Sequence, residues 1–266
     1  MHHLESSNEI IFLRDASRLI ESVKCRKDGF KVLPALSVCI QPSADWENTL
    51  LNLSSWVEMA IPKLFEFGEK RAHKAFISTS DTITKPSYSK RLVEPFLGAS
   101  NAQIENLVRL FKKEPNSGGL VFTVFEPKDL EFRRRPGYVP CIVAGTFQKV
   151  GDRLDLMTFF RSQSLIEFAI FDLLFLRSLQ TVFIERVRTN DDRFQDLKVG
   201  QLNLTYNRIV VPDRLAKKKT SWVHRNEALP AWLDVIERAA QSIDLLSNSS
   251  NEQAMNIFRS KKSPIA

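Results

Sequence analysis

A cysteine, an arginine and an aspartate occur at spacings that could assemble a reactive site. Cys141 follows a proline, Arg161 comes twenty positions later and precedes Ser162, and Asp172 lies eleven positions past the arginine. A cysteine thiolate is a nucleophile, and it needs nearby positive charge, which Arg161 could supply. The fork of N–H donors on an arginine also suits a phosphate, and Ser162 would donate a further hydrogen bond to the same group. These residue types permit nucleophilic chemistry on an anionic substrate.

Each of these residues also has an ordinary structural interpretation. A lone cysteine on a strand is often inert and behaves as a small hydrophobe. Arg161 could form a surface or interface ion pair, and Asp172 could be a helix carboxylate paired with a basic residue such as Arg208. The isolated His73 and His224 are interpreted as surface residues, so we expect no metal site. The residue types alone leave these alternatives open.

The elements that must position these side chains follow from hydrophobic periodicity. Asp172 falls on a predicted helix over 163–186 that is apolar nearly all round and should be central and buried. Cys141 and Arg161 fall on two predicted strands, 139–149 and 153–161, joined by a tight turn at Gly151-Asp152. The other predicted helices cover 8–24, 45–73 with an interruption at Pro62, 101–113 with an asparagine cap, and about 228–246. The other predicted strands cover 31–40 and 120–125, and residues 198–211 hold one or two strands, Val199 to Leu204 and Arg208 to Val211.

Length and composition indicate an ordinary globular protein. The 266 residues are 43% hydrophobic and 26% charged, which allows a sizeable core. We interpret residues 1–266 as a single α+β domain whose last part, 248–266, is a loose tail. Three widely spaced cysteines without a CxxC motif argue against disulfides and structural zinc, and a reducing cytoplasm is the simplest location.

Charge and hydropathy restrict the class of partner. No stretch approaches ~18 uncharged apolar residues, so we expect no membrane-spanning helix, and the polar start lacks the apolar core of a secretion signal. The net charge of +7 permits nucleotides, nucleic acid or acidic lipids as partners. The run Lys217-Lys218-Lys219, with Trp222 and Arg225, could contact a nucleic-acid backbone, although an exposed loop is the simpler interpretation.

The order of the motifs is similar to that of one enzyme family. The matching pieces, in chain order, are Tyr88-Ser89-Lys90-Arg91, Gln103-Ile104 leading to Pro115-Asn116-Ser117, Pro140-Cys141, Arg161-Ser162, Phe171-Asp172 and the closing Lys262-Ser263-Pro264-Ile265-Ala266. From about Pro86 to Val211, nearly half of the chain, this order resembles the thymidylate synthase and deoxycytidylate hydroxymethylase family. That family carries its nucleophile in a Pro-Cys pair and binds phosphate through the arginine of an Arg-Ser pair.

The resemblance implies both a fold and an activity. The fold would be thymidylate-synthase-like: a mixed β-sheet with flanking helices, forming a homodimer through the sheet, which would otherwise expose a large apolar surface. Cys141 would add to C6 of a pyrimidine nucleotide and turn C5 into a nucleophile toward 5,10-methylenetetrahydrofolate. Arg161 and Ser162 would hold the anion. Tyr88 and Arg208 are further candidates for substrate binding.

Asp172 is the most informative departure from the thymidylate branch, which has asparagine at this position and pairs it with uracil. A carboxyl group can accept a hydrogen bond from the amino group of cytosine and share a proton with ring atom N3. The deoxycytidylate and cytidylate hydroxymethylases of the family carry aspartate here. The resemblance therefore implies a cytosine-type ring.

Other departures remove groups that the family's chemistry uses. Ile142 replaces the histidine after the cysteine, and Gly118-Gly119 replace an arginine pair that reaches the partner's phosphate, for which Lys90 and Arg91, or Arg133-Arg134-Arg135, could substitute. The proton-transfer glutamate has no counterpart at 32–36, and Glu58 is only a distant candidate. Phe160 stands where the family has glutamine before the Arg-Ser pair, and Ser164 stands where it has aspartate after that pair. The family's His-x-Tyr, which holds the sugar, falls on Asn203-Leu204-Thr205.

Two function classes follow from these observations. The chain is either an atypical one-carbon transferase acting on C5 of a cytosine-type nucleotide, or a non-catalytic descendant that kept the fold and binds a nucleotide or a partner protein. The retained motifs favour the first class and the missing groups favour the second. Whether the chain is an enzyme is therefore left open by the sequence.

Overall fold

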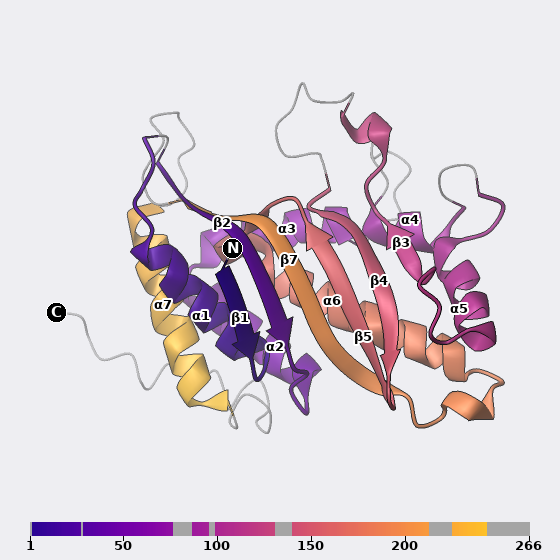
Figure 1. The fold of residues 1–266 in the computed structure, drawn as a ribbon. Coiled ribbons are helices and arrows are strands. Elements are labelled where there is room, and N and C mark those ends of the chain that lie inside the picture. The colour runs from indigo at the N-terminus through magenta and orange to yellow at the C-terminus, as the bar shows by residue number, and fades with distance from the viewer. Residues whose placement is uncertain are drawn as a thin grey trace.

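The chain folds into helices and a mixed β-sheet, so the expected α+β class is confirmed (Figure 1). A computed structural model describes residues 2–27, 29–76, 87–95, 99–130, 140–212 and 225–243. In chain order the main elements are β1 (His2–Ser6), α1 (Glu9–Ser22), β2 (Phe30–Ile40), α2 (Trp46–Ala60), α3 (Pro62–Phe76), α4 (Tyr88–Val93), α5 (Gln103–Lys113), β3 (Val121–Thr123), β4 (Ile142–Val150), β5 (Arg153–Phe160), β6 (Gln163–Ser164), α6 (Leu165–Arg188), β7 (Lys198–Pro212) and α7 (Arg225–Gln241), with short 3₁₀ turns at Pro127–Leu130 and Asp192–Phe194.

The sheet runs in the order β1-β2-β7-β5-β4-β3, and the short β6 pairs with β7. β1 is parallel to β2, and β7 is antiparallel to β2 but parallel to β5. β4 pairs antiparallel with both β5 and β3. Because β4 and β5 form a hairpin, the start of β4 and the end of β5 meet at the same end of the sheet.

The described helices cover one face of the sheet (Figure 1). Along β5 the side chains of Leu154, Leu156 and Phe160 are buried toward the helices, as the period of two in a half-buried strand requires. The opposite face keeps Met157 and Phe159 exposed, at 50% and 43%. Val121 and Val150 are exposed on the neighbouring strands. In the described part of the chain, this second face of the sheet has no helix over it.

Helix α6 is the centre of the helical layer. Its 24 residues carry buried side chains around much of its circumference, as the apolar sequence predicts. Helix α3 packs directly on its first turn, because a Cβ atom at Gly68 would collide with the carbonyl oxygen of Glu167. The same first turn lies at the sheet end where β5 stops and β6 pairs with β7.

A buried ion pair joins the layers. Arg177 of α6 donates from Nε to Oε1 of Glu9 at 2.7 Å, and both side chains are fully buried. Arg177 also donates to the carbonyl oxygen of Gly200 on β7. A buried charge is tolerated only when it is paired and hydrogen-bonded, so these contacts fix α1 and β7 against α6.

The structure corrects several boundaries predicted from sequence. Of the one or two strands expected in 198–211, the structure has one, β7, because this segment pairs along its length with β2 and β5. The cap residue of α5 is Ala102, not Asn101, and it makes no side-chain capping bond. Strand β1 was not predicted, since its polar sequence has no apolar alternation and it forms by pairing with β2.

Some expectations lie outside the described residues: the arginine run 133–135, the lysine run 217–219 with Trp222, His224, and the tail 248–266 with the motif at 262–266. No helix in the described part of the chain combines the length and apolar character that a bilayer crossing needs.

Candidate functional site

Cys141 is held by its backbone at the start of β4. Its N–H donates to the hydroxyl oxygen of Tyr88 at 2.7 Å, and Tyr88 is buried in an aromatic cluster with Phe76 and Phe175. The pairing of β4 with β5 shifts register between Ile142 and Ala144, immediately after the cysteine. Bulges of this kind re-aim side chains next to functional sites. Tyr88, predicted to contact substrate, therefore positions the cysteine.

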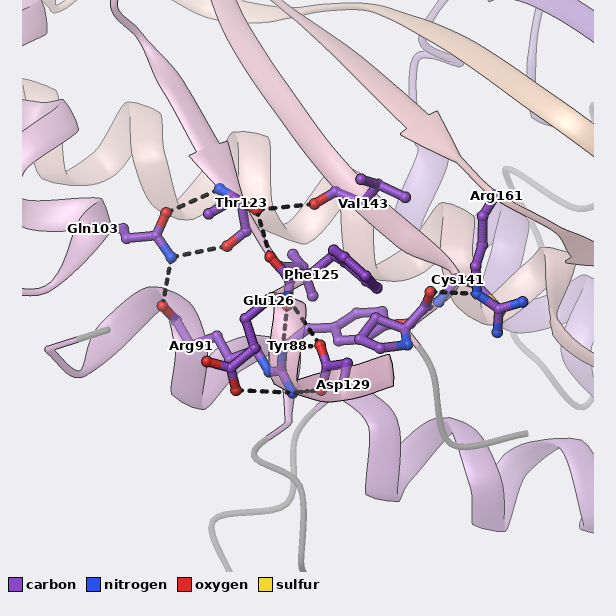
Figure 2. Close-up of polar contacts among 12 residues, drawn as sticks. Tyr88, Arg91, Gln103, Thr123, Phe125, Glu126, Asp129, Cys141, Val143 and Arg161 are labelled. Atoms are coloured by element: carbon purple, nitrogen blue, oxygen red, sulfur yellow. Dashed lines mark hydrogen bonds and ion pairs between the residues drawn. The ribbon is translucent and has the colours of Figure 1, made fainter. Parts of the chain in front are cut away.

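Arg161 lies directly against the Pro140-Cys141 segment. Its backbone N–H donates to the carbonyl oxygen of Cys141 at 2.9 Å, and its Nε donates to the carbonyl oxygen of Pro140 at 2.8 Å. Figure 2 shows the Arg161 side chain beside Cys141, at the end of the hairpin. The structure thus brings together the cysteine and the arginine that are twenty positions apart in the sequence.

The thiol of Cys141 is protonated at neutral pH in this arrangement. Burial and then the charge of Asp172 raise its pKa from 9.0 to about 11. Three guanidinium groups oppose this rise, those of Arg161, Arg71 and Arg208. The negative charge on Asp172 is therefore one of the factors that keep this cysteine from being a nucleophile.

Asp172 is buried on α6 with only 3% of its surface exposed. Burial raises its pKa from 3.8 to about 7, although the neighbouring Gln163 amide favours the ionised form. Among the described residues, Asp172 Oδ2 has no partner at hydrogen-bonding geometry. After burial, the same carboxylate contributes to the raised pKa values of Cys141, Tyr88 and Tyr206, so these three groups lie near Asp172.

Ser162 and Arg208 interact with each other. Arg208 Nε donates to Ser162 Oγ at 3.2 Å, on the solvent side of the site. The alternative in which Arg208 neutralises Asp172 is wrong: no ion pair joins them in the described part of the chain, and Asp172 is buried while Arg208 is exposed. Arg208 is close enough to lower the pKa of the Cys141 thiol, so it contributes positive charge to the site.

Arg91 is not a substitute phosphate ligand. It is buried on α4 and donates from Nη1 and Nη2 to the carboxylate of Asp129 at 2.7 and 2.8 Å, with Glu126 at 3.9 Å (Figure 2). Gln103 accepts from the Thr123 N–H and donates to the carbonyl oxygens of Arg91 and Thr123. This network anchors α4, the helix that begins with Tyr88, against β3. Glu58, the distant glutamate candidate, is exposed on α2.

Three further residues belong to the site and were missed from sequence. Arg71 on α3 lies over the rings of Phe67 and Phe168, and no spacing relates it to Cys141. Tyr206 on β7 is buried at the sheet end beside Phe160. Gln163 had a signal: it is a polar residue at the start of an otherwise apolar run, directly after Arg161-Ser162.

An apolar groove of about 490 Å³ lies between α3, α4, α5 and α6. Its aromatic lining includes Phe76, Phe171 and Phe175, with Glu69, His73 and Arg186 as charged or titratable members. Phe171 precedes Asp172 on α6, so the groove and the polar site share one helix. Among the described residues, no cluster of histidine, cysteine and carboxylate side chains could hold a metal ion.

Neither the protein-family models nor the curated proteins contain a match to this chain. The site therefore has to be interpreted from its own chemistry.

Proposed function

We propose that this chain is a divergent thymidylate-synthase-like protein that binds a cytosine-type pyrimidine nucleotide and transfers a one-carbon unit to its C5, with Cys141 as the nucleophile. The observation that carries the proposal is the convergence of a thiol, a buried carboxyl with an unpartnered oxygen, and three arginines at one sheet end. Each group matches one part of such a ligand: the reactive carbon, the ring edge and the phosphate.

The ring would be recognised by Asp172. With its pKa at about 7, the carboxyl can carry a proton near neutral pH and share it with N3 of cytosine. Its other oxygen, which has no partner among the described residues, would accept from the 4-amino group. A buried acceptor left unpaired is costly, so a ligand that pairs it gains affinity.

Binding of the ring would also activate the thiol. The negative charge of Asp172 is the second-largest cause of the raised pKa of Cys141. A proton shared between Asp172 and N3 removes that charge, and the three arginines then balance the phosphate as well as the thiolate. Binding of the correct ring would therefore lower the pKa of the thiol through Asp172.

The covalent step follows from this arrangement. The thiolate sulfur forms a bond to C6, the C5–C6 double bond opens, and the electron pair is delocalised toward N3, where the proton of Asp172 is held. C5 then attacks an electrophilic one-carbon group, its former hydrogen leaves as a proton to water, and the electron pair of that C–H bond re-forms the C5–C6 double bond and expels the sulfur as thiolate, while Asp172 takes back the proton held at N3. Arg161, Arg71 and Arg208 would hold the phosphate within one chain, which compensates for Gly118-Gly119.

The co-substrate implied by the resemblance, 5,10-methylenetetrahydrofolate, would supply the one-carbon unit. Cys141, Arg161 and Asp172 do not line the apolar groove between α3, α4, α5 and α6, so we do not assign the co-substrate to that groove.

The open sheet face would form the contact between two copies. Its exposed apolar side chains, Val121, Val150, Met157 and Phe159, make the patch that such a contact would bury. Sedimentation of the full chain tests this part: Met157→Lys should shift a dimer to monomer, and a monomeric wild type would contradict it.

The activity is tested by release of tritium from deoxycytidylate labelled at C5, in the presence of 5,10-methylenetetrahydrofolate. We expect release by the wild type and none by Cys141→Ser, with Cys25→Ser, in the segment between α1 and β2, as the matched control. Asp172→Asn should shift preference toward a uracil ring. No release by the wild type with any cytosine or uracil nucleotide would refute the catalytic proposal.

A second candidate is a non-catalytic protein that binds the same nucleotide. It is favoured by the pKa of Cys141, which at about 11 leaves almost no thiolate at neutral pH, and by the buried Ile142 in place of a polar neighbour. Calorimetry separates the two: nucleotide binding by the wild type without tritium release supports this candidate.

A further inference from the structure

Gln163 is a second buried polar side chain at the site with no assigned role. It lies on β6, directly after Arg161-Ser162, and only 1% of its surface is exposed. Within the described residues, neither its Nε2 nor its Oε1 has a partner at hydrogen-bonding geometry, and neither does Asp172 Oδ2. Native proteins rarely leave several buried polar atoms unpaired in one place, because each costs stability. Because the amide NH₂ of Gln163 interacts with the Asp172 carboxylate, the two acceptor oxygens, Gln163 Oε1 and Asp172 Oδ2, are the atoms left for a bound molecule.

The orientation of the amide follows from its neighbour. Gln163 favours the ionised form of Asp172, which requires that its NH₂ group, rather than its carbonyl, faces the carboxylate. Oε1 then remains as an acceptor. Asp172 raises the pKa of Cys141 and interacts with Gln163, so two buried acceptor oxygens from different elements, one on β6 and one on α6, lie near the cysteine.

We propose that Gln163 is a specificity-determining residue: its Oε1 and Asp172 Oδ2 together accept the two hydrogens of an exocyclic amino group on the bound ring. A 4-aminopyrimidine supplies two N–H donors at one nitrogen, one for each oxygen. A 4-oxo ring would instead place its carbonyl oxygen against both acceptors and leave all three unpaired. This inference rests on the proposed nucleotide-binding function and adds a second contact that distinguishes cytosine from uracil.

The test is calorimetric binding of deoxycytidylate and deoxyuridylate to the full chain. Gln163→Met keeps the side-chain length and removes both polar atoms, and Gln148→Met, at an exposed position on β4, is the matched control. We expect the wild type and the control to prefer deoxycytidylate. Gln163→Met should lose about tenfold in deoxycytidylate affinity, about 1.4 kcal/mol, and should gain deoxyuridylate affinity, because one of the two acceptors that oppose its 4-oxo group is gone.

Each outcome decides the matter. Unaltered preference for deoxycytidylate in Gln163→Met, or an equal loss for both nucleotides, overturns the role of Gln163 and leaves the proposed function standing. A wild type that binds neither nucleotide overturns the proposed function and this inference with it. If Gln163→Met does not fold, Gln163→Asn, which withdraws the amide by one methylene, should show the same selective loss.

A ligand-free measurement tests the orientation separately. Carbon NMR titration of the Asp172 carboxyl should show a higher pKa in Gln163→Met than in the wild type, because the amide that favours the carboxylate is removed. An unchanged titration would mean that the amide does not face Asp172, and the proposal would then be wrong.

Discussion

The buried carboxyl of Asp172 should make the protein less stable as pH rises through neutrality, and Asp172→Asn should abolish that loss. The pKa of Asp172 is raised by burial from 3.8 to about 7. Between these values the folded state keeps a proton that the unfolded state has released. Stability from this group is therefore fully present below about pH 4 and is lost progressively up to about pH 7.

The size of the effect follows from the shift itself. At ~1.4 kcal/mol per pH unit, a rise from 3.8 to about 7 corresponds to about 4 kcal/mol. Because Asp172 is only 3% exposed, little of this is screened by solvent. Asparagine has nearly the same shape but does not ionise. The stability of Asp172→Asn relative to the wild type should therefore increase by up to about 4 kcal/mol between pH 4 and pH 8.

Urea unfolding at a series of pH values measures this difference directly, since all other titrating groups are common to both proteins. Asp152→Asn is the control: Asp152 is exposed and its pKa is lowered by Lys198, so its removal should change the pH dependence in the opposite direction. A difference between Asp172→Asn and wild type that does not vary with pH would refute the reasoning, because it would mean that Asp172 is well solvated or paired in the folded state.

Three other predictions concern the supports of the site. Tyr88→Phe leaves the Cys141 N–H without its acceptor, so we expect a loss of about 1–2 kcal/mol in unfolding experiments; an unchanged stability would contradict this support. Glu9→Gln leaves the buried charge of Arg177 without a counter-charge and should lower the free energy of unfolding by about 3–5 kcal/mol. Glu9→Gln combined with Arg177→Met should cost less than the two single changes added together. Strict additivity in this double-mutant cycle would count against the ion pair. In Asp172→Asn, Cys141 should react faster with iodoacetamide at pH 8 than in the wild type, because a charge that raises the pKa of its thiol is gone. Peptide mass spectrometry, with Cys25 as internal reference, measures the rate of alkylation. An unchanged rate at Cys141 would contradict the role of Asp172.

Much of the fold could be predicted from local patterns. The long apolar helix, the tight turn at Gly151 and the interruption at Pro62 all occur where periodicity and turn chemistry indicate. β1 could not be predicted, because an edge strand of polar residues depends on its partner strand for its conformation. For the same reason β7, whose two apolar stretches look separate in the sequence, is continuous between β2 and β5.

The site was predictable only in part. The resemblance in motif order implied a shared location for Cys141, Arg161 and Asp172, and the hairpin and α6 bring them to one sheet end. The pairing of Arg91 with Asp129 could not be anticipated, since it joins positions that no local pattern relates. The contribution of Arg71 is similar: it reaches the site from α3 across the first turn of α6.

The sequence by itself determined the α+β class, the buried central helix and the residue types that could carry chemistry, because hydrophobic periodicity and side-chain chemistry are local properties. Only the tertiary structure decided which of those groups are charged and which are paired. Burial raises the pKa values of Cys141 and Asp172. Arg91 forms an ion pair with Asp129, and Gln163 Oε1 is buried without a hydrogen-bond partner in the described part of the chain. Desolvation and hydrogen-bond partners depend on what packs around a group, and that environment is assembled from distant parts of the chain.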